Sequence, residues 1–286
     1  FNLMKPRVMS LVLFTCMVGL VIAPKEVSIL NSICSLLAVA LGAGAAGTLN
    51  MWYESDLDAL MSRTCLRPIP TGQVTKNQAL LFGVLLSVAS VTLLYFSSNL
   101  VSALLLLFTI FFYFFVYTVW LKRRTPQNIV IGGAAGALPP AIGWTIATGS
   151  LTIEPIILFL IIFLWTPSHF WALSIYKSDD YKKANIPMLP NIYGVNKTKK
   201  NIFVYSLLML PVITFPYAIS FLSIFYFLPS LILTIYYIYL CGTLLTSKNK
   251  TNNNLLARKI FLYSIFYLFV IFLLILLDHF IVNFYG

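Results

Sequence analysis

Apolar stretches of about 20 residues alternate with short polar segments along the whole chain, and this length matches an α-helix that crosses a bilayer. Several stretches contain proline or glycine, which neighbouring helices can accommodate inside a membrane. The pattern predicts an all-α, polytopic membrane protein with nine transmembrane helices, built as a single domain over residues 1–286. The expected spans are residues 8–24, 28–50, 78–97, 100–121, 128–148, 155–176, 202–222, 224–246 and 259–283.

Composition and charge support the same class. Hydrophobic residues make up 60% of the 286 residues and charged residues only 9%, whereas soluble domains are about 25% charged. The formal charge of +11 gathers in segments that nine spans place on one side of the membrane, with only Lys25 on the other. The positive-inside rule then places the N-terminus in the cytoplasm. We therefore expect the lipid bilayer, and no nucleic acid, as the partner of this basic chain.

A first acidic cluster follows the second expected span. Asn50, Glu54 and Asp58 are four residues apart, so a helix places them on one face with a drift of about 40° per step. Carboxylates beside a membrane core are costly unless they are paired or bound to a metal. Mg²⁺ takes one or two protein carboxylates and completes its shell with water and substrate phosphates. We interpret this face as a metal–diphosphate site, and we expect Asp56, which lies on the opposite face, to stay outside it.

Two arginines, Arg63 and Arg67, follow this cluster before a Pro-x-Pro turn. Guanidinium groups bind diphosphate oxygens bidentately, which makes both arginines candidate substrate ligands. The alternative is an ordinary helix end whose charged residues form a solvated face. An amide on the same face and two arginines directly after it favour the functional interpretation.

A second acidic cluster, around Asp180, follows the sixth expected span on the same side of the membrane. Asp180 lies four residues after Tyr176, so the pair shares a helical face and Asp180 is a candidate ligand for a second Mg²⁺. Taken alone, a segment with neighbouring acidic and basic residues is usually a solvated loop. Because the first cluster lies on the same side of the membrane, a site shared by both clusters is favoured.

Basic and imidazole groups near these clusters have two interpretations each. Lys122 and Arg123 end the fourth span, where they either anchor it by the positive-inside rule or attract an anionic substrate. His169 lies inside the sixth span, where it either bonds a neighbouring helix or contacts the substrate. Pro139 and Pro140 should kink the fifth span.

These motifs together resemble the UbiA superfamily of intramembrane prenyltransferases, over nearly the whole chain. The acidic clusters alone indicate the superfamily, and longer strings resemble its branch that attaches a farnesyl group to haem. The strings are KPRVMSLVLFT (5–15), NMWYESDLDALMSRT (50–64), RPIP (67–70), LKRRTPQNIVIGGAAGALPP (121–140) and WTPSHFWALSIYKSDDYKKANIPMLP (165–190).

The resemblance implies nine helices around a central cavity, with two acidic motifs that face each other and hold Mg²⁺ and prenyl diphosphate. It implies transfer of farnesyl from farnesyl diphosphate to a vinyl group of haem b, with water added, giving haem O. His169 would then contact the tetrapyrrole iron or a propionate. The implied catalytic residues are Asn50, Glu54, Asp58 and Asp180, with Glu54, Asp58 and Asp180 as metal ligands; the implied substrate-binding residues are Arg63, Arg67, Lys122, Arg123, Tyr176 and His169. The second motif departs from the family pattern, because Tyr176 and Ala184 stand where other branches place acidic residues.

Two alternatives remain open from the sequence. One is a sister prenyltransferase acting on an aromatic quinone precursor, against which the haem-type strings argue. The other is a transporter of an anionic solute, but alternating access centres on a midplane site, whereas both acidic clusters lie at one face. We expect a bacterial inner membrane rather than an organellar one, because we recognise no transit segment before the first span. We also expect association with a haem A synthase or a terminal oxidase assembly.

Overall fold

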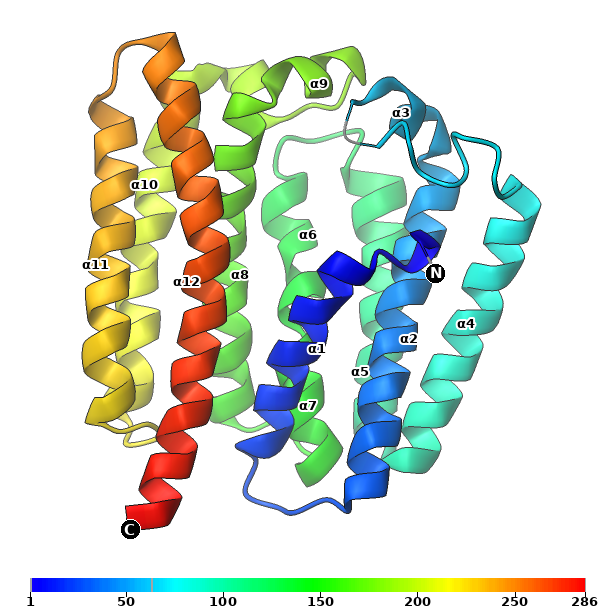
Figure 1. Cartoon of the computed structure of the whole chain (residues 1–286), viewed down its shortest axis with the longest axis vertical. Coiled ribbons are helices and arrows are strands. Elements are labelled where there is room, and N and C mark those ends of the chain that lie inside the picture. The colour runs from blue at the N-terminus through cyan, green and yellow to red at the C-terminus, as the bar shows by residue number, and fades with distance from the viewer. Residues whose placement is uncertain (1, 63, 286) are drawn as a thin grey trace.

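The computed structural model describes residues 2–62 and 64–285 and consists of long helices that run roughly side by side (Figure 1). The elements are η1 (Asn2–Met4), α1 (Pro6–Val21), α2 (Ile29–Tyr53), α3 (Ser55–Leu60), α4 (Lys76–Ser97), α5 (Leu100–Phe111), η2 (Phe112–Leu121), α6 (Asn128–Ala137), α7 (Pro139–Thr148), α8 (Ile153–Tyr176), α9 (Ser178–Lys183), α10 (Leu189–Ala218), α11 (Ile224–Thr246) and α12 (Lys250–Tyr285).

The membrane-spanning segments confirm the predicted fold class. Within residues 2–62 and 64–285, eight helical segments are long and apolar enough to cross a membrane, and a shorter apolar stretch, Met9–Val21, lies in α1. The segment η2 continues α5 as one span, and α6 and α7 together form another. The molecule is therefore an all-α, polytopic membrane protein.

Two helices extend well beyond their predicted spans. α10 begins at Leu189 and α12 at Lys250, whereas apolarity alone places these spans at residues 202–222 and 259–283. Hydropathy marks only the part of a helix that suits lipid, and backbone hydrogen bonds continue into the polar segment. A kink at Gly194, whose φ is 81°, separates the first turns of α10 from the rest of the helix.

The fifth span breaks where the sequence predicts a kink. α6 ends at Ala137 and α7 begins at Pro139, because proline lacks the N–H that would continue the helical ladder. Below the break, Gly143 of α7 lies directly against α1, since a Cβ there would sit 1.9 Å from the Cys16 carbonyl oxygen. This close approach fixes α1 against the broken span.

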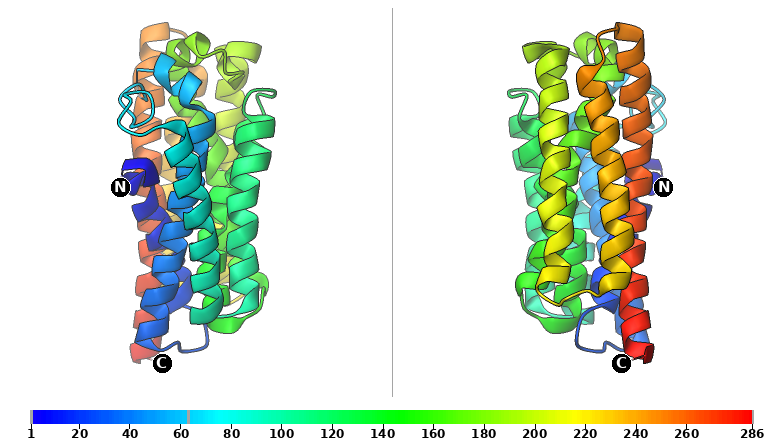
Figure 2. Two further views of the ribbon diagram at one scale, coloured as in Figure 1. Left: turned by 90° about the vertical axis from the view of Figure 1, so that its right-hand side faces the viewer. Right: turned by 90° about the vertical axis from the view of Figure 1, so that its left-hand side faces the viewer.

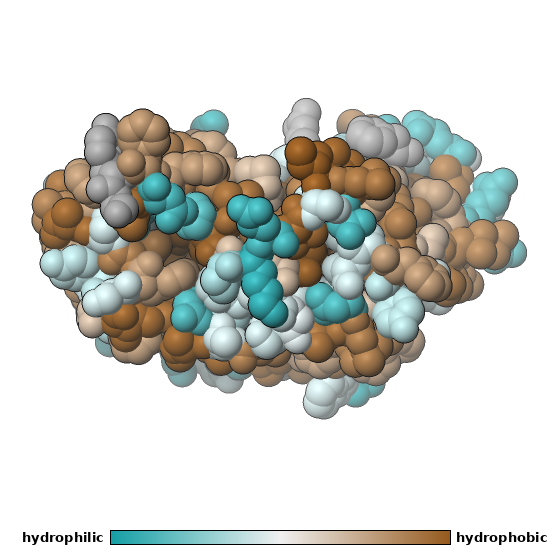
Figure 3. Space-filling view, turned by 90° about the horizontal axis from the view of Figure 1, so that it is seen from below, coloured by the Kyte–Doolittle hydropathy of each residue, from teal (hydrophilic) through white to brown (hydrophobic). Residues whose placement is uncertain are grey.

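The two short helices that carry Asp58 and Asp180 lie at the same end of the bundle. α3 and α9 both cap the upper end in Figure 1, while the N-terminal segment lies against the side of the bundle below them (Figures 1 and 2). Hydrophilic and hydrophobic residues mix on the opposite end surface (Figure 3). The bundle thus gathers the predicted chemistry at one end, as the sequence indicates.

Candidate active site

The candidate site is built on the junction between α2 and α3. α2 ends at Tyr53, yet helical spacing continues through Glu54, because the Glu54 N–H donates to the Asn50 carbonyl at 3.0 Å and the Asp58 N–H donates to the Glu54 carbonyl at 2.8 Å. Asn50, Glu54 and Asp58 are only 2%, 1% and 4% exposed. Asn50 Nδ2 donates to Glu54 Oε2 at 2.8 Å, which confirms that both side chains share one face.

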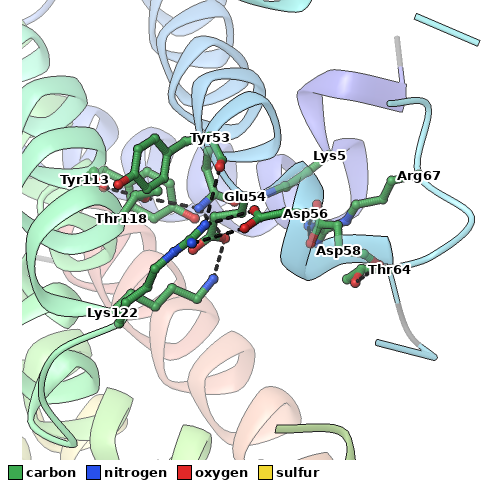
Figure 4. A network of polar contacts seen from close by, with 12 residues as sticks. Lys5, Tyr53, Glu54, Asp56, Asp58, Thr64, Arg67, Tyr113, Thr118 and Lys122 are labelled. Carbon is green, nitrogen blue, oxygen red and sulfur yellow. Dashed lines mark hydrogen bonds and ion pairs between the residues drawn. The ribbon is translucent and has the colours of Figure 1, made fainter. Parts of the chain in front are cut away.

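A π-helical segment brings two more groups to this face. In η2 the turns are widened to five-residue spacing, as the 2.9 Å bond from the Lys122 N–H to the Tyr117 carbonyl shows. The Thr118 hydroxyl accepts a 3.1 Å hydrogen bond from Asn50 Nδ2, and Lys122 Nζ lies 2.5 Å from Glu54 Oε2 (Figure 4). Lys122 therefore belongs to the site and compensates the charge of buried Glu54.

The second carboxylate, Asp58, has its own cation. Arg67 Nη1 donates to both Asp58 carboxylate oxygens, at 2.8 and 2.7 Å, and the Thr64 hydroxyl donates to the Asp58 carbonyl at 2.9 Å. The loop that follows α3 thus folds back over the site. Arg67 is placed where the sequence predicts it, whereas Arg63 lies outside the described residues.

Asp56 forms a separate pair on the other face of the short helix. Arg123 donates to its two carboxylate oxygens at 3.1 and 2.9 Å and lies over the Tyr53 ring. Partial burial works against the charge of Asp56, but the hydrogen bond from Arg123 holds the pKa of this carboxyl below its usual value. Arg123, predicted as a substrate ligand, is therefore engaged with Asp56 at the edge of the site.

Lys5 is a site residue that the sequence interpretation missed. Its Nζ donates to Asn50 Oδ1 at 2.6 Å, so Asn50 is fixed from both ends of its amide (Figure 4). Burial, followed by repulsion from Arg67 and Lys122, lowers the pKa of Lys5 to about 7. A lysine ahead of an apolar span is usually a positive-inside anchor, and only its place in the string KPRVMSLVLFT pointed elsewhere.

Small residues of α2 make room for the segment that carries Lys5. A Cβ on Gly44 would lie 2.6 Å from the Met4 side chain, and the Thr48 hydroxyl donates to the Leu3 carbonyl at 3.3 Å. Lys5 itself has a left-handed backbone with φ of 53°, which turns the chain from η1 into α1. The N-terminal segment therefore delivers an ammonium group to Asn50.

The oxygen atoms on this face suit a hard divalent cation. Glu54 Oε1 is buried and has no hydrogen-bond partner in the part of the chain that the structure describes. An ionised carboxylate oxygen of this kind is a ready metal ligand. Among residues 2–62 and 64–285, however, no group of three acidic, histidine or cysteine side chains is already gathered for a metal. Glu54 and Asp58 would have to exchange their cation partners for the ion.

Among the described residues, a side-chain hydrogen bond joins the second acidic cluster to the loop after the first. The Ser62 hydroxyl donates to Asp180 Oδ2 at 2.7 Å, which joins the loop after α3 to α9. Tyr176, at the end of α8, lines a small cavity with residues of α12. Asp180 as a ligand of a second metal stays a prediction.

His169 bonds a neighbouring helix. Its Nδ1 lies 2.6 Å from the Ser264 hydroxyl of α12, and its ring is stacked between Trp165 and Phe261. This arrangement matches the structural interpretation of the sequence. Contact between His169 and a substrate stays a prediction.

Comparison with known proteins gives concordant results. A family model described as the UbiA prenyltransferase family matches residues 12–270. A protoheme IX farnesyltransferase of Pelagibacter ubique is 65% identical over 278 residues, which is 97% of this chain and 92% of the relative. Among solved structures, a digeranylgeranylglyceryl phosphate synthase matches with a TM-score of 0.80 at 20% identity, covering 97% of this chain and 96% of the other. A UbiA homologue from Archaeoglobus fulgidus bound to GPP and Mg²⁺ matches with a TM-score of 0.68 at 16% identity, covering 93% and 98%.

Proposed function

Because the chain belongs to the UbiA prenyltransferase family, we propose that it transfers farnesyl from farnesyl diphosphate to a vinyl group of haem b. One water is added, and the products are haem O and diphosphate. The observation that carries the proposal is the buried face of Asn50, Glu54 and Asp58, found in a chain 65% identical to a relative named protoheme IX farnesyltransferase. The face supplies carboxylate oxygens and cations together, as a metal–diphosphate substrate requires.

The carboxylates of this face would hold Mg²⁺. Glu54 offers Oε1, which has no hydrogen-bond partner among the described residues, Asp58 offers its carboxylate, and Asn50 supports Glu54 through its amide. Asp180 would hold a second Mg²⁺ on the other side of the diphosphate. Mg²⁺, when bound, stabilises the negative charge that develops on the departing diphosphate, as a Lewis acid. The complex of the Archaeoglobus fulgidus homologue with GPP and Mg²⁺ supports this assignment.

Three basic side chains would bind the diphosphate oxygens. Lys122 and Arg67 are held at 2.5 and 2.7 Å from Glu54 and Asp58, and Lys5 lies on Asn50. With metal and substrate bound, Glu54 and Asp58 would hold the ion, and Lys122 and Arg67, released from these carboxylates, would bind phosphate oxygens. The ion pairs thus keep the buried charges compensated before substrate binding, since an uncompensated buried charge is costly. Arg123 and Arg63 would add to the same cationic rim.

The reaction also depends on keeping water away from the reacting carbon. Departure of diphosphate leaves an allylic farnesyl cation, which the electron-rich vinyl carbon captures. The low exposure of Asn50, Glu54 and Asp58 supports a site shielded from bulk solvent. His169 would lie on the haem side of the site, toward the iron or a propionate, with its Nδ1 held by Ser264.

Membrane orientation follows from the charge pattern. The end that carries α3 and α9 would face the cytoplasm of a bacterium, with the N-terminus on that side and the protein in the inner membrane. Association with a haem A synthase or a terminal oxidase assembly would let the product pass to its next enzyme. Labelling of Cys65 in the loop after α3 with a membrane-impermeant thiol reagent should succeed only from the cytoplasmic side.

A turnover assay tests the proposal. Purified protein in detergent is given haem b, farnesyl diphosphate and Mg²⁺, with and without EDTA, and products are read by mass spectrometry. We expect a product heavier than haem b by a farnesyl group plus water, which EDTA abolishes. Prenylation of an aromatic acid in a parallel reaction, with none of haem, would overturn the haem assignment and keep the family.

A further inference from the structure

A cavity of about 380 Å³ opens between the ends of α8 and α12, and its lining belongs to other helices than those that carry Glu54 and Asp58. Its lining consists of Tyr176, Lys250, Thr251, Asn254, Leu255 and Arg258, and we call it the α8–α12 cavity. Lys250, Asn254 and Arg258 are four residues apart, so they present one face of α12 to Tyr176. The cavity is therefore defined by side chains that α12 aligns over two turns.

The α8–α12 cavity is cationic. Its lining contains two basic side chains, a phenol, an aliphatic hydroxyl and an amide, and it contains no carboxylate. Neither Lys250 nor Arg258 takes part in an ion pair with an acidic side chain of residues 2–62 and 64–285. Guanidinium and ammonium groups that have donors to spare bind carboxylates well. This chemistry fits an anionic ligand.

Aromatic rings continue from the α8–α12 cavity toward the interior of the bundle. Tyr176 packs edge-on against Phe261 with centroids 5.9 Å apart, and Phe261 stacks on His169 at 4.6 Å. His169 in turn stacks on Trp165 at 4.3 Å. Phe261 lies about one turn after Arg258, toward the middle of α12. The basic side chains at the start of this helix are therefore followed by aromatic rings.

This gradient matches the shape of a haem. A haem carries two propionate carboxylates on one edge, a flat apolar ring, and its vinyl groups on the opposite side. Carboxylates placed at the charged end of the helices would direct the vinyl side away from the aqueous surface. They would also lie away from Glu54 and Asp58, which avoids contact between like charges.

We propose that the α8–α12 cavity binds the propionates of the tetrapyrrole substrate, with Arg258 and Lys250 as their ligands, an inference that rests on the proposed function. Tyr176 would close the cavity from the α8 side. The site gives a ligand to two exposed cations that form no ion pair with the described acidic side chains. It assigns the orientation of the acceptor to α8 and α12 and the binding of the donor to α2, α3 and η2.

The test compares Arg258→Gln with Lys259→Gln, which removes the same charge from an exposed neighbour outside the cavity lining. Each protein is assayed with haem b and with haem b dimethyl ester, whose propionates are uncharged. We expect Arg258→Gln to raise the KM for haem b about 10-fold, the loss of roughly one charge-assisted hydrogen bond. The KM for farnesyl diphosphate should stay the same, and Lys259→Gln should resemble the wild type.

The esterified substrate makes the assignment specific. The wild type should show a raised KM for the dimethyl ester, and Arg258→Gln should raise it no further. Equal losses on haem b and its ester, or no loss on either, would overturn the proposal. A defect that appears only when anionic phospholipid is added to the detergent would show a lipid headgroup site instead.

A binding measurement separates this proposal from the proposed function. Haem absorption titrations on the same three proteins, each with haem b and with the dimethyl ester, report affinity without turnover. If the wild type forms no farnesylated product yet binds haem b more tightly than Arg258→Gln does, the transfer reaction is wrong and the propionate site stands. If turnover proceeds and haem b binds both proteins equally, the propionate site is wrong and the transfer reaction stands.

Discussion

Ser62 donates a 2.7 Å hydrogen bond to Asp180, and these two residues are 118 positions apart in the chain. The contact joins the loop after α3 to α9, so it links the two acidic clusters directly. It also occupies the carboxylate that the sequence assigns to a metal. Asp180 therefore has two candidate roles, a latch between the two loops and a metal ligand.

Substitution at both ends separates these roles. Ser62→Ala removes one exposed hydrogen bond, worth about 0.5–1.5 kcal/mol, and should leave kcat within roughly 3-fold of the wild type. Asp180→Asn retains a hydrogen-bond acceptor but removes the charge, and should lower kcat by about 100-fold if the carboxylate stabilises the bound metal and diphosphate. The kcat of both variants in the haem b assay is the measurement. Equal losses in the two variants would mean that Asp180 acts as the latch.

Asp58 provides the test of the first metal position. Asp58→Asn keeps the size and one acceptor of the side chain but loses the charge that faces Arg67. We expect kcat to fall about 10²–10³-fold, the scale of losing one preorganised electrostatic group, and the Mg²⁺ concentration for half-maximal rate to rise. Asp56→Asn is the matched control, because Asp56 pairs with Arg123 away from the buried face. Full turnover by Asp58→Asn would remove Asp58 from the metal assignment.

The contact between α1 and α7 predicts a stability effect without a direct effect on chemistry. A Cβ on Gly143 would lie 1.9 Å from the Cys16 carbonyl oxygen, so Gly143→Ala must push backbone apart and should destabilise the protein by about 1–3 kcal/mol. Gly136→Ala is the control, because nothing lies within 4 Å of a Cβ there. Thermal unfolding of both variants in detergent should show a lower midpoint for Gly143→Ala alone. Equal midpoints would mean that α1 can move away from α7 at little cost.

The sequence predicts the spans and the buried face well because both depend on short-range regularities. Apolar length gives the helices, and four-residue spacing places Asn50 and Glu54 together, as their 2.8 Å hydrogen bond shows. Pairings across the bundle cannot be obtained in this way. Which cation meets Glu54 depends on the π-helical segment that ends before Lys122, and spacing along the chain carries no signal for it.

The role of Lys5 also could not be predicted from the sequence. Its position before an apolar span fits the ordinary role of a basic anchor, and nothing in its neighbours predicts a contact 45 residues away. The contact arises because Gly44 of α2 leaves room for Met4, the residue before Lys5, where a Cβ would lie 2.6 Å from the Met4 side chain. A structural glycine in one helix thus decides the chemistry of a lysine in another segment.

The lowered pKa of Lys5 predicts that diphosphate binding takes up a proton. Burial and the nearby cations bring this pKa to about 7, from 10.5 in an unfolded chain. Between these two values the unfolded chain binds more protons at this position, so the contribution of Lys5 to stability rises with pH from about 7 to 10.5. An anionic diphosphate beside the amine favours the charged form and raises its pKa again. At pH 8 the free protein should therefore hold mostly neutral Lys5, and the complex should hold the ammonium.

Calorimetry in buffers of different ionisation enthalpy measures this uptake. Wild-type protein titrated with farnesyl diphosphate and Mg²⁺ at pH 8 should take up close to one proton, and the uptake should vanish at pH 5.5, where Lys5 is already charged. Lys5→Arg is the matched control, because its guanidinium stays charged and should bind the diphosphate without uptake. Lys5→Met should lose both the uptake and about 10-fold in affinity. An uptake that persists unchanged in Lys5→Arg would assign the proton to another group and leave Lys5 as a purely structural partner of Asn50.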